Sequence, residues 1–271
     1  MSLFDEAPAP SSTPAAPSGP SVRVRLQVAY NGRDFHGFAL QAAGVRTVAS
    51  VLSATLAKVL QLPEPPVLTC AGRTDTGVHA WDQWVHVDVP ASLDVTGLHR
   101  RLVKLLAPEI VVRGVDIAPA GWDARHSALS RTYRYDVLTT PVPSPLNAGF
   151  VWWLPGALDL RAMSLACDAI IGTHDFGSFC RKQGDATLVR RVMDAGWSSP
   201  APGLLRFEIT ANAFCQQMVR SLVGTLVDIG GGKRRAGEML SIIHAKDRAV
   251  VVGALAPPDG LILWEVRYPD E

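Results

Sequence analysis

The sequence predicts an α+β fold built from two similar halves, each with a mainly antiparallel sheet. The main observation is that the expected elements follow the order β-α-β-β-α-β and then β-α-β-β-α-α-β, so that a similar order occurs twice. The second is the length of 271 residues, which suits one large domain or two medium ones and is enough for a substantial core. We expect a tail over residues 1–21, an N-terminal half over 22–118 and a C-terminal half over 119–271. A cleft between the halves is the natural ligand site.

Period-two alternation and helical stripes define the elements of the N-terminal half. Val22 to Val28 alternate with arginine and glutamine, which is typical of a half-buried strand with a basic outer face. Thr47 can cap the helix that follows it, and Pro108 ends the next helix. The expected elements are strands over 22–28, 67–70, 85–89 and 110–117, and helices over 48–60 and 98–106.

The C-terminal half shows the same two periodicities, interrupted by a stretch rich in proline. Four prolines within residues 141–156 predict a long loop or flap. The expected elements are strands over 133–137, 189–197 and 204–211, and helices over 163–171 and 214–229.

The charge distribution is compatible with a nucleic-acid partner. Residues 1–21 are rich in Pro, Ala and Ser, which predicts disorder, and they carry Asp5 and Glu6 but no Lys or Arg. Without them the chain has 26 basic and 25 − 2 = 23 acidic side chains, so the net charge rises from +1 to +3. Basic clusters that share a face can neutralise phosphates, although such clusters are often only solvated surface. They are Arg100–Arg101, Arg181–Lys182, Arg190–Arg191 and Lys233–Arg235.

The four cysteines, at positions 70, 167, 180 and 215, show neither a Cys-x-x-Cys pair nor a zinc-like spacing. We therefore expect a reducing compartment and no structural metal. The N-terminus lacks the pattern of a signal peptide, and no apolar run reaches the roughly 20 residues of a membrane span. These observations predict a cytoplasmic protein.

One run, Gly72-Arg73-Thr74-Asp75-Thr76-Gly77-Val78-His79-Ala80, combines reactive groups with backbone freedom. Glycines on both sides of Asp75 permit positive φ and let a substrate approach the main chain. An aspartate held in this way can act as a nucleophile or stabilise charge on a ligand. The alternative is a tight turn in which Asp75 and Arg73 pair only with each other.

This run, with Cys70 and Ala71 before it, resembles the signature of the TruA family of tRNA pseudouridine synthases. One departure is Gly37-Phe38-Ala39-Leu40-Gln41, where the family usually has Gly-Trp-x-x-Gln, which affects expectations about RNA contacts. The resemblance covers about residues 22–269. Further segments that resemble the family follow in the expected order: 30–38, 131–135, 175–179, 213–220, 223–226, 260–263 and 266–269.

The resemblance implies the pseudouridine synthase fold, with two halves around a deep cleft, and an isomerase that converts uridine to pseudouridine. It implies that Asp75 is catalytic and that Tyr133 lines the active site. It also implies action on the tRNA anticodon arm at positions 38 to 40, a homodimer, and no cofactor.

The chemistry requires Asp75 to be ionised. Its carboxylate can act on C1′ as the glycosidic bond breaks, or add to C6 of uracil, and the sequence leaves both routes open. Arg73 or Arg220 could lower the pKa of Asp75 through its charge. Arg220 is the better candidate for a salt bridge from the opposite half, the alternative being a helix-surface arginine.

The target uridine must leave its base stack before it can react. Tyr133 offers an aromatic face for stacking and a hydroxyl for proton transfer, and Tyr135 is the competing choice on the same strand. Leu261 or Leu263 could form an apolar wall behind the base, or could be simple core. Among the basic residues we expect the following to contact RNA: Arg181, Lys182, Arg190 and Arg191.

Two rival chemistries and two rival functions remain. A Cys70 thiolate could add to uracil C6, but its place in an apolar strand favours packing. Asp75 and His79 could suggest a metal pair, although no third ligand is evident. The protein could instead be a non-catalytic RNA-binding protein or tRNA chaperone of the same fold, or a metal-dependent hydrolase.

Overall fold

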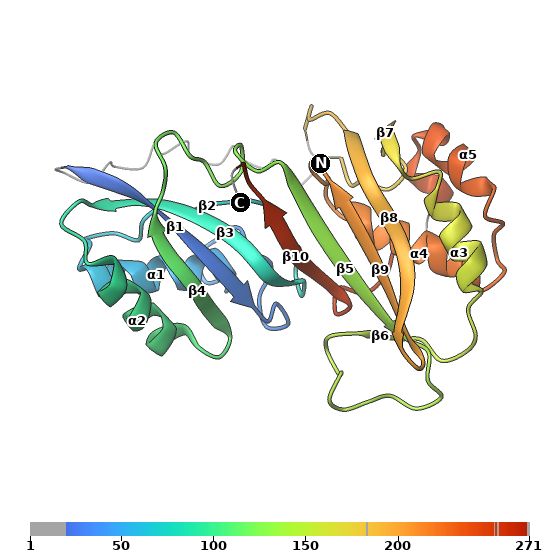
Figure 1. Ribbon diagram of the computed structural model, residues 1–271, viewed down its shortest axis with the longest axis horizontal. Coiled ribbons are helices and arrows are strands. Elements are labelled where there is room, and N and C mark those ends of the chain that lie inside the picture. The colour runs from blue at the N-terminus through green and yellow to red at the C-terminus, as the bar shows by residue number, and fades with distance from the viewer. Residues whose placement is uncertain (1–19, 183, 252, 254, 270–271) are drawn as a thin grey trace, which may run out of the picture.

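The computed structural model describes residues 20–182, 184–251, 253 and 255–269 (Figure 1). In chain order its elements are β1 (Ser21–Tyr30), α1 (Val48–Leu60), β2 (Thr69–Cys70), β3 (His79–Pro90), α2 (Val95–Leu106), β4 (Ile110–Ile117), β5 (Ser130–Leu138), β6 (Trp152–Trp153), α3 (Leu160–Cys167), β7 (Gly172–Asp175), β8 (Val189–Ala201), β9 (Leu204–Ala211), α4 (Met218–Gly230), α5 (Glu238–Ala245), a short 3-10 helix (Arg248–Val251) and β10 (Leu261–Arg267).

The strands of the described residues form one ten-stranded sheet. Its order is β4-β1-β3-β10-β5-β9-β8-β7, with β2 paired to β3 and β6 paired to β5. The pairings are antiparallel except those of β10 with β3 and of β6 with β5. The predicted α+β class with a mainly antiparallel sheet is therefore confirmed, but the sheets expected for the two halves are continuous.

Strand β10 joins the two parts of the sheet, because it lies between β3 and β5 (Figure 1). Ile262 pairs in parallel with His79, the first residue of β3. On its other edge, Leu263 pairs with Tyr133 and Leu261 with Tyr135 of β5. The end of the chain thus brings the Asp75 loop, which precedes β3, close to the strand that carries both candidate tyrosines.

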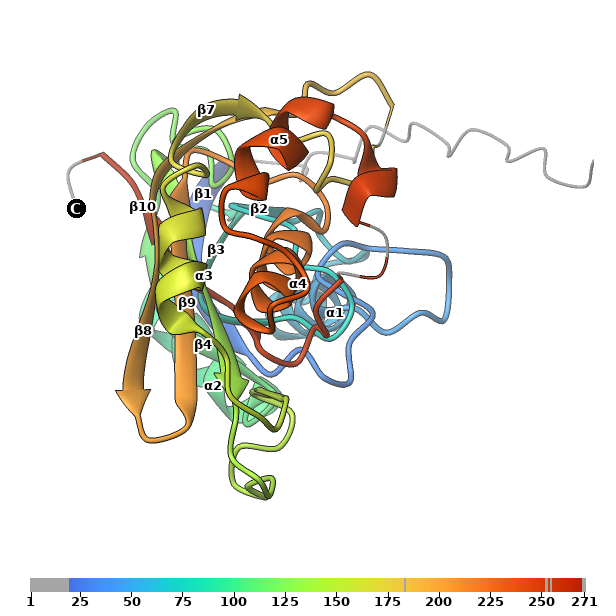
Figure 2. The same cartoon turned by 90° about the vertical axis from the view of Figure 1, so that its right-hand side faces the viewer.

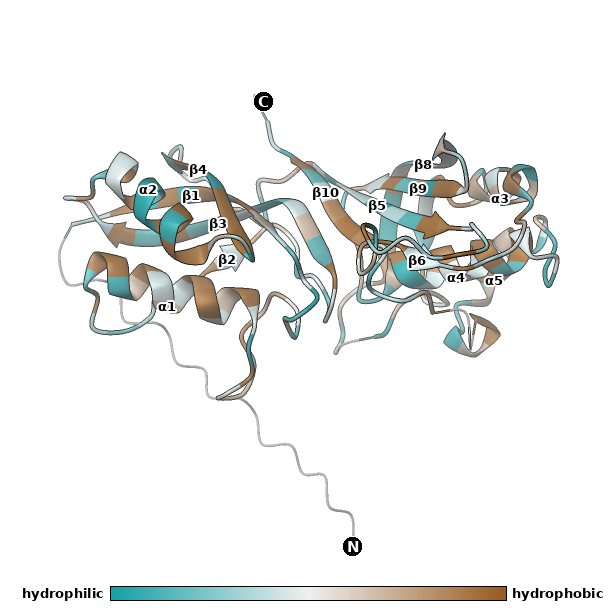
Figure 3. Cartoon of the chain, turned by 90° about the horizontal axis from the view of Figure 1, so that it is seen from below, coloured by the Kyte–Doolittle hydropathy of each residue, from teal (hydrophilic) through white to brown (hydrophobic). Residues whose placement is uncertain are grey.

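Helices α1 and α4 lie on the same side of the sheet (Figures 2 and 3), and the strands show alternating hydrophobic and hydrophilic bands (Figure 3). Helix α1 begins as predicted: the Thr47 side chain accepts a hydrogen bond from the backbone of Ser50, and the Ser50 side chain accepts one from the backbone of Thr47. Leu52 and Leu56, in the middle of its apolar stripe, are completely buried. Helix α4 is buried over most of its length, including Thr225. Most of α4 is therefore core, and only its ends are placed to face solvent or ligand.

Some predicted boundaries are wrong, for local reasons. Helix α3 ends at Cys167 rather than at residue 171, although the buried Ile170 continues the apolar spacing in a turn. Helix α4 begins at Met218 rather than at residue 214, because Gln217 takes a left-handed backbone conformation with φ 65°. Strands β6 and β7 were not predicted, since so few residues show no measurable alternation.

The predicted tail lies outside the described residues except for Pro20 and Ser21. Ser21 is the first residue of β1, and the Pro20 carbonyl accepts a hydrogen bond from the Ala91 N–H at 3.0 Å. These two residues belong to the folded part of the chain, which corrects the boundary predicted at residue 21. The division between the halves near residue 118 stays a prediction.

The segment after β1 packs directly on the Asp75 loop. The Phe38 N–H donates to the Thr74 carbonyl at 3.0 Å, and the Gly77 N–H donates to the Phe35 carbonyl at 3.2 Å. Gly37 has φ +86°, and a Cβ at this position would lie 2.7 Å from the Thr74 carbonyl oxygen. Glycine at position 37 is therefore required twice, by its backbone conformation and by this close approach.

We expect Gly37→Ala to reduce the free energy of unfolding more than Gly44→Ala does. Both glycines have nearly the same positive φ, but a Cβ at Gly44 would meet nothing within 4 Å. The shared backbone strain costs about 1–2 kcal/mol, and only Gly37→Ala must also displace the Thr74 backbone. Denaturant unfolding of both variants measures the difference, and equal losses would show that the contact with Thr74 is unimportant.

Candidate active site

Asp75 lies on a loop whose backbone is fixed at several points. The loop joins β2 to β3, and the Val78 N–H closes it by donating to the Asp75 carbonyl at 3.1 Å. Gly77 has φ +79°, and a Cβ there would lie 2.9 Å from the Pro258 ring. The segment that precedes β10 therefore packs against the Asp75 loop.

A buried polar network holds the residues before Asp75. The side chain of Gln83, which is completely buried, donates to the Gly72 carbonyl at 2.6 Å and accepts from the Gly72 N–H at 3.3 Å. The Tyr30 hydroxyl and the Thr74 hydroxyl lie 2.7 Å apart and share a hydrogen bond. Because both sides of this network are buried, the loop presents Asp75 on a rigid support.

The pKa of Asp75 is raised, mainly because burial disfavours the charged carboxylate. The charge of Arg220 opposes this rise, as do hydrogen bonding from the Gln216 side chain and the Gln217 backbone and the charge of Arg181. All four opposing groups come from the C-terminal part of the chain. The net shift of the Asp75 pKa is upward, while the charge of Arg220 acts to lower it, as predicted.

Arg220 and Arg73 differ from their predicted arrangements. Arg220 donates from Nε to the Ala256 carbonyl at 2.7 Å. No ion pair within 4.0 Å joins Asp75 to Arg220 or to Arg73 among the described residues, so the predicted salt bridge is absent and Arg220 acts at longer range. Arg73 is exposed, and its charge lowers the pKa of Cys70 rather than that of Asp75.

The two candidate tyrosines have different surroundings, although both are buried. The Tyr135 hydroxyl donates to the Pro257 carbonyl at 2.8 Å. The Tyr133 hydroxyl lies 3.8 Å from the point where a Cβ on Gly72 would stand, and its ring meets Phe214 edge-on with centroids 5.0 Å apart. Burial raises the pKa of Tyr133, and the negative charge of Asp75 raises it further. Tyr133 therefore lies beside the Asp75 loop, whereas the hydroxyl of Tyr135 is used within the fold.

Leu261 and Leu263 lie in β10 directly opposite the two tyrosines and are almost completely buried. Residues paired across two strands point to the same face of the sheet. These leucines share a face with Tyr133, which is the arrangement that an apolar wall would need, and their burial is equally that of core residues.

The four basic residues predicted to contact RNA do not form one cluster. Arg181 and Lys182 are exposed, and the charge of Arg181 reaches Asp75. Arg190 and Arg191 are neighbours on β8, so their side chains point to opposite faces of the sheet. Arg190 is partly buried, whereas Arg191 is exposed. Arg190 and Arg191 therefore lack the shared face that a phosphate-neutralising cluster needs.

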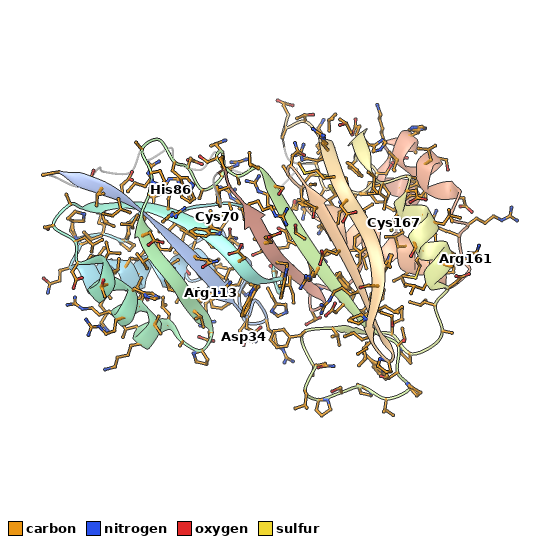
Figure 4. The ribbon with its side chains drawn as sticks, viewed as in Figure 1. Asp34, Cys70, His86, Arg113, Arg161 and Cys167 are labelled. Atoms are coloured by element: carbon orange, nitrogen blue, oxygen red, sulfur yellow. A yellow bond between two sulfur atoms is a disulfide. The ribbon has the colours of Figure 1, made fainter. Side chains whose placement is uncertain are left out.

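The cysteines also depart from the expectation that all four are free thiols. Cys180 and Cys215 form a disulfide with Cα atoms 5.7 Å apart. Cys70 and Cys167 are free and buried, and they lie on opposite sides of β10 (Figure 4). Burial raises the pKa of Cys70 to about 12, so its thiol stays protonated near neutral pH. This disfavours the rival thiolate mechanism.

His79 is a packing residue rather than half of a metal pair. It is buried, its Nδ1 accepts a hydrogen bond from the Gly32 N–H at 3.0 Å, and its ring stacks on Phe150 at 4.7 Å. The described residues contain no group of three or more His, Cys, Asp or Glu side chains that could hold a metal ion.

Sequence reasoning assigned no role to Gln216 and Gln217, both of which act on Asp75. Both lay inside the helix predicted from residue 214, so the unpaired backbone N–H groups at the observed start of α4 were not expected. What was lacking was the information that this helix faces the Asp75 loop.

Comparison with known proteins places this geometry in a family. A family model described as tRNA pseudouridine synthase matches residues 166–269. The tRNA pseudouridine synthase A of Corynebacterium glutamicum is 40% identical over 264 residues, which cover 92% of this chain and 90% of that protein. This chain belongs to the tRNA pseudouridine synthase A family. The family member of Mycobacterium leprae is also 40% identical, with 92% and 91% of the two chains covered.

As a member of the tRNA pseudouridine synthase A family, the protein has the pseudouridine synthase fold and is an isomerase that converts uridine to pseudouridine in tRNA. Among solved structures, the archaeal box H/ACA sRNP Nop10-Cbf5 complex aligns with 86% of this chain and 61% of that chain, at 11% identity and a TM-score of 0.33. A score this low adds nothing to the assignment. In the described part of the chain, no helix combines the length and the apolar character needed to cross a membrane.

We expect Cys70→Ser to retain most of the synthase activity. Cys167→Ser is the matched control, because it also places a hydroxyl at a buried cysteine position but lies in α3, across β10 from Cys70. Rates of pseudouridine formation in tRNA, compared at equal folded fraction, provide the measurement. A folded but inactive Cys70→Ser protein beside an active Cys167→Ser protein would restore the thiolate mechanism.

Proposed function

We propose that Asp75 is the catalytic carboxylate and that the substrates are uridines at positions 38 to 40 of the tRNA anticodon arm. The observation that carries the first part is the position of Asp75 on a rigid loop, opposite Gln216, Gln217 and Arg220 at the start of α4. The choice of uridines follows from the family resemblance.

The reaction breaks the N1–C1′ bond, turns the uracil over and joins its C5 to C1′. It involves no net oxidation, so a carboxylate with a proton donor or acceptor nearby is sufficient in principle. An ionised Asp75 can stabilise or attack C1′, as carboxylates do in glycosidases, or can add to C6. Either route leaves a proton at C5 that must be removed to complete the reaction.

The surroundings of Asp75 suit both routes. Burial raises its pKa, which makes the carboxylate a stronger nucleophile and base than an exposed aspartate. Arg220 and Arg181 oppose the rise, which favours the ionised form that both routes require.

Tyr133 is the better of the two tyrosines for a role at the substrate. Its hydroxyl makes no hydrogen bond to any described residue, whereas the Tyr135 hydroxyl is bonded to Pro257. A flipped uracil would enter beside Tyr133, with Leu263 and Leu261 behind it. We assign the Tyr133 hydroxyl to proton transfer or to hydrogen bonding with the base.

Contacts with tRNA outside this pocket are assigned to exposed basic residues. Arg181 and Lys182 are the best placed, because the charge of Arg181 already reaches the active site. Arg191 and Arg190 could contribute only from different faces of β8. From the family resemblance we also propose a homodimer that acts in the cytoplasm.

We expect Asp75→Asn to abolish pseudouridine formation while tRNA binding is retained. Loss of one essential catalytic group lowers turnover by roughly 10³-fold or more. Substantial residual turnover in the Asp75→Asn protein would reject the assignment.

The same variant makes a prediction for stability. The pKa of Asp75 is higher in the folded protein than in the unfolded chain. The neutral carboxyl therefore contributes to the stability of the fold below the unfolded pKa of about 4, and this contribution is lost as pH rises through the folded pKa. At pH 7 the wild-type protein carries the cost of burying a charge, which Asp75→Asn removes. We therefore expect the Tm of the variant to equal or exceed that of wild type at pH 7, with the advantage shrinking as pH falls. A variant advantage that grew toward acidic pH would contradict the sign of the pKa shift.

Tyr133→Phe and Tyr135→Phe should separate catalysis from stability. Removing a proton-transfer group costs about 10²–10⁴-fold in turnover, which we expect for Tyr133→Phe with little change in Tm. Tyr135→Phe leaves the Pro257 carbonyl without its partner, so we expect a loss of about 1–3 kcal/mol in stability with turnover largely kept. Single-turnover rates and denaturant unfolding measure the two effects, and the reverse pattern would exchange the roles of the tyrosines.

A further inference from the structure

Arg131, in the middle of the sheet, is a buried cation bonded only to backbone carbonyls. Its side chain is 7% exposed, and it makes no ion pair with any carboxylate of the described residues. Nε and Nη2 donate to the Ala71 carbonyl at 3.2 and 2.8 Å, and Nη2 also donates to the Arg125 carbonyl at 2.6 Å. Nη1 donates to the carbonyls of Ala128 at 3.2 Å and Asn212 at 2.8 Å. One guanidinium thus collects four carbonyls from separate segments.

Two of these carbonyls belong to the segments that build the active site. Ala71 directly precedes the run from Gly72 to Asp75, on the N-terminal side of the sheet junction. Asn212 directly follows β9 and begins the turn that carries Gln216 into α4. The Arg131 guanidinium is the bridge between these two segments, which meet around the Asp75 carboxylate.

The bonding pattern requires arginine in particular. A guanidinium offers five N–H donors in one rigid plane, whereas an ammonium is a compact charge with three donors. Burial lowers the pKa of Arg131, but an arginine side chain stays charged at neutral pH. A buried charge without a carboxylate partner is tolerated only when oxygen dipoles surround it, and here those dipoles are backbone groups.

We propose that Arg131 is a positioning residue that sets the Asp75 loop against the start of α4. It fixes the spacing between Asp75 and the groups on the opposite segment, Gln216, Gln217 and Arg220. The proposal rests on the proposed catalytic role of Asp75, because positioning matters for turnover only if Asp75 reacts.

The causes of the pKa shift of Asp75 support this role. Burial raises that pKa, and the groups on the α4 side lower it. If the two segments separate, the hydrogen bonds from Gln216 and Gln217, which lower the pKa of Asp75, weaken first, because hydrogen bonds need close contact. The pKa of Asp75 then rises further, and the acidic limb of the turnover profile moves to higher pH. A residue that only stabilised the fold would lower Tm without moving this limb.

The test compares Arg131→Lys and Arg131→Met with the same changes at Arg134. Arg134 is a matched control from the same strand: its side chain points to the opposite face, pairs with Glu208 and lies over the Trp264 ring at 3.7 Å. For both Arg131 variants we expect kcat to fall by about 10²-fold, the scale of a 1 Å misplacement at a reacting centre. We also expect the KM for tRNA to change little and the acidic limb of kcat to shift upward. The Arg134 variants should keep the wild-type profile.

A second measurement uses the wild-type protein and holds even if the Arg131 variants do not fold. Native-state hydrogen exchange should show that residues 71–78 and 212–218 open together, with the same dependence on denaturant. In a folded Arg131→Lys protein both segments should exchange faster than in the Arg134→Lys protein.

Each outcome decides the proposal. Independent opening of the two segments in wild type, or folded Arg131 variants with a wild-type kcat and pH profile, would overturn it. Failure of the proposed function would look different, because Asp75→Asn would then stay active. Linked exchange of the two segments would still report whether Arg131 couples them.

Discussion

Strand β10 pairs with the two parts of the molecule at once, and the active site depends on this double pairing. On one edge it runs parallel to the start of β3, immediately after the Asp75 loop. On the other edge it runs antiparallel to β5, which carries Tyr133 and Arg131. Parallel pairing requires a long connection between the strands. Here nearly the whole C-terminal half forms that connection, so the site is complete only when the last strand is in place.

Around Asp75 two opposing effects act on the same carboxylate. The packing that makes the loop rigid also removes water, which raises the cost of the charge that the proposed mechanism requires. The fold offsets this cost with groups from the start of α4 rather than with a direct ion pair. Arg220 and Arg181 act through their charge, and Gln216 and Gln217 through hydrogen bonds, so ionisation is favoured by several groups together.

Buried cations at the junction follow a related principle. Arg131 binds carbonyl oxygens and Arg220 binds the Ala256 carbonyl, so neither is neutralised by a neighbouring carboxylate. Of the two, Arg220 acts on Asp75, and its charge favours the ionised carboxylate. Elsewhere in the sheet a partly buried arginine, Arg206, is paired with the Asp136 carboxylate instead.

Local patterns predicted most of the elements. Alternation in residues 22–28 and the capping threonine before α1 depend on near neighbours only, and both were confirmed. The Asp75 run was recognised because its glycines and carboxylate lie next to each other in the chain. Predictions were wrong where a boundary depended on one backbone angle, as at Gln217, or on very short strands such as β6 and β7.

By itself the sequence determined the fold class, the family resemblance and the choice of the Asp75 loop as the candidate site, because these follow from short-range patterns of polarity and residue type. Only the tertiary structure decided which distant groups act on that loop. Strand register and helix packing decide the contact of Gln216 with Asp75, the Cys180–Cys215 disulfide and the opposite directions of Arg190 and Arg191. They also decide that, within the described part of the chain, neither Arg73 nor Arg220 forms an ion pair with Asp75. Contacts between residues far apart in the chain arise from the order of strands in the sheet, and that order is not encoded in any single segment.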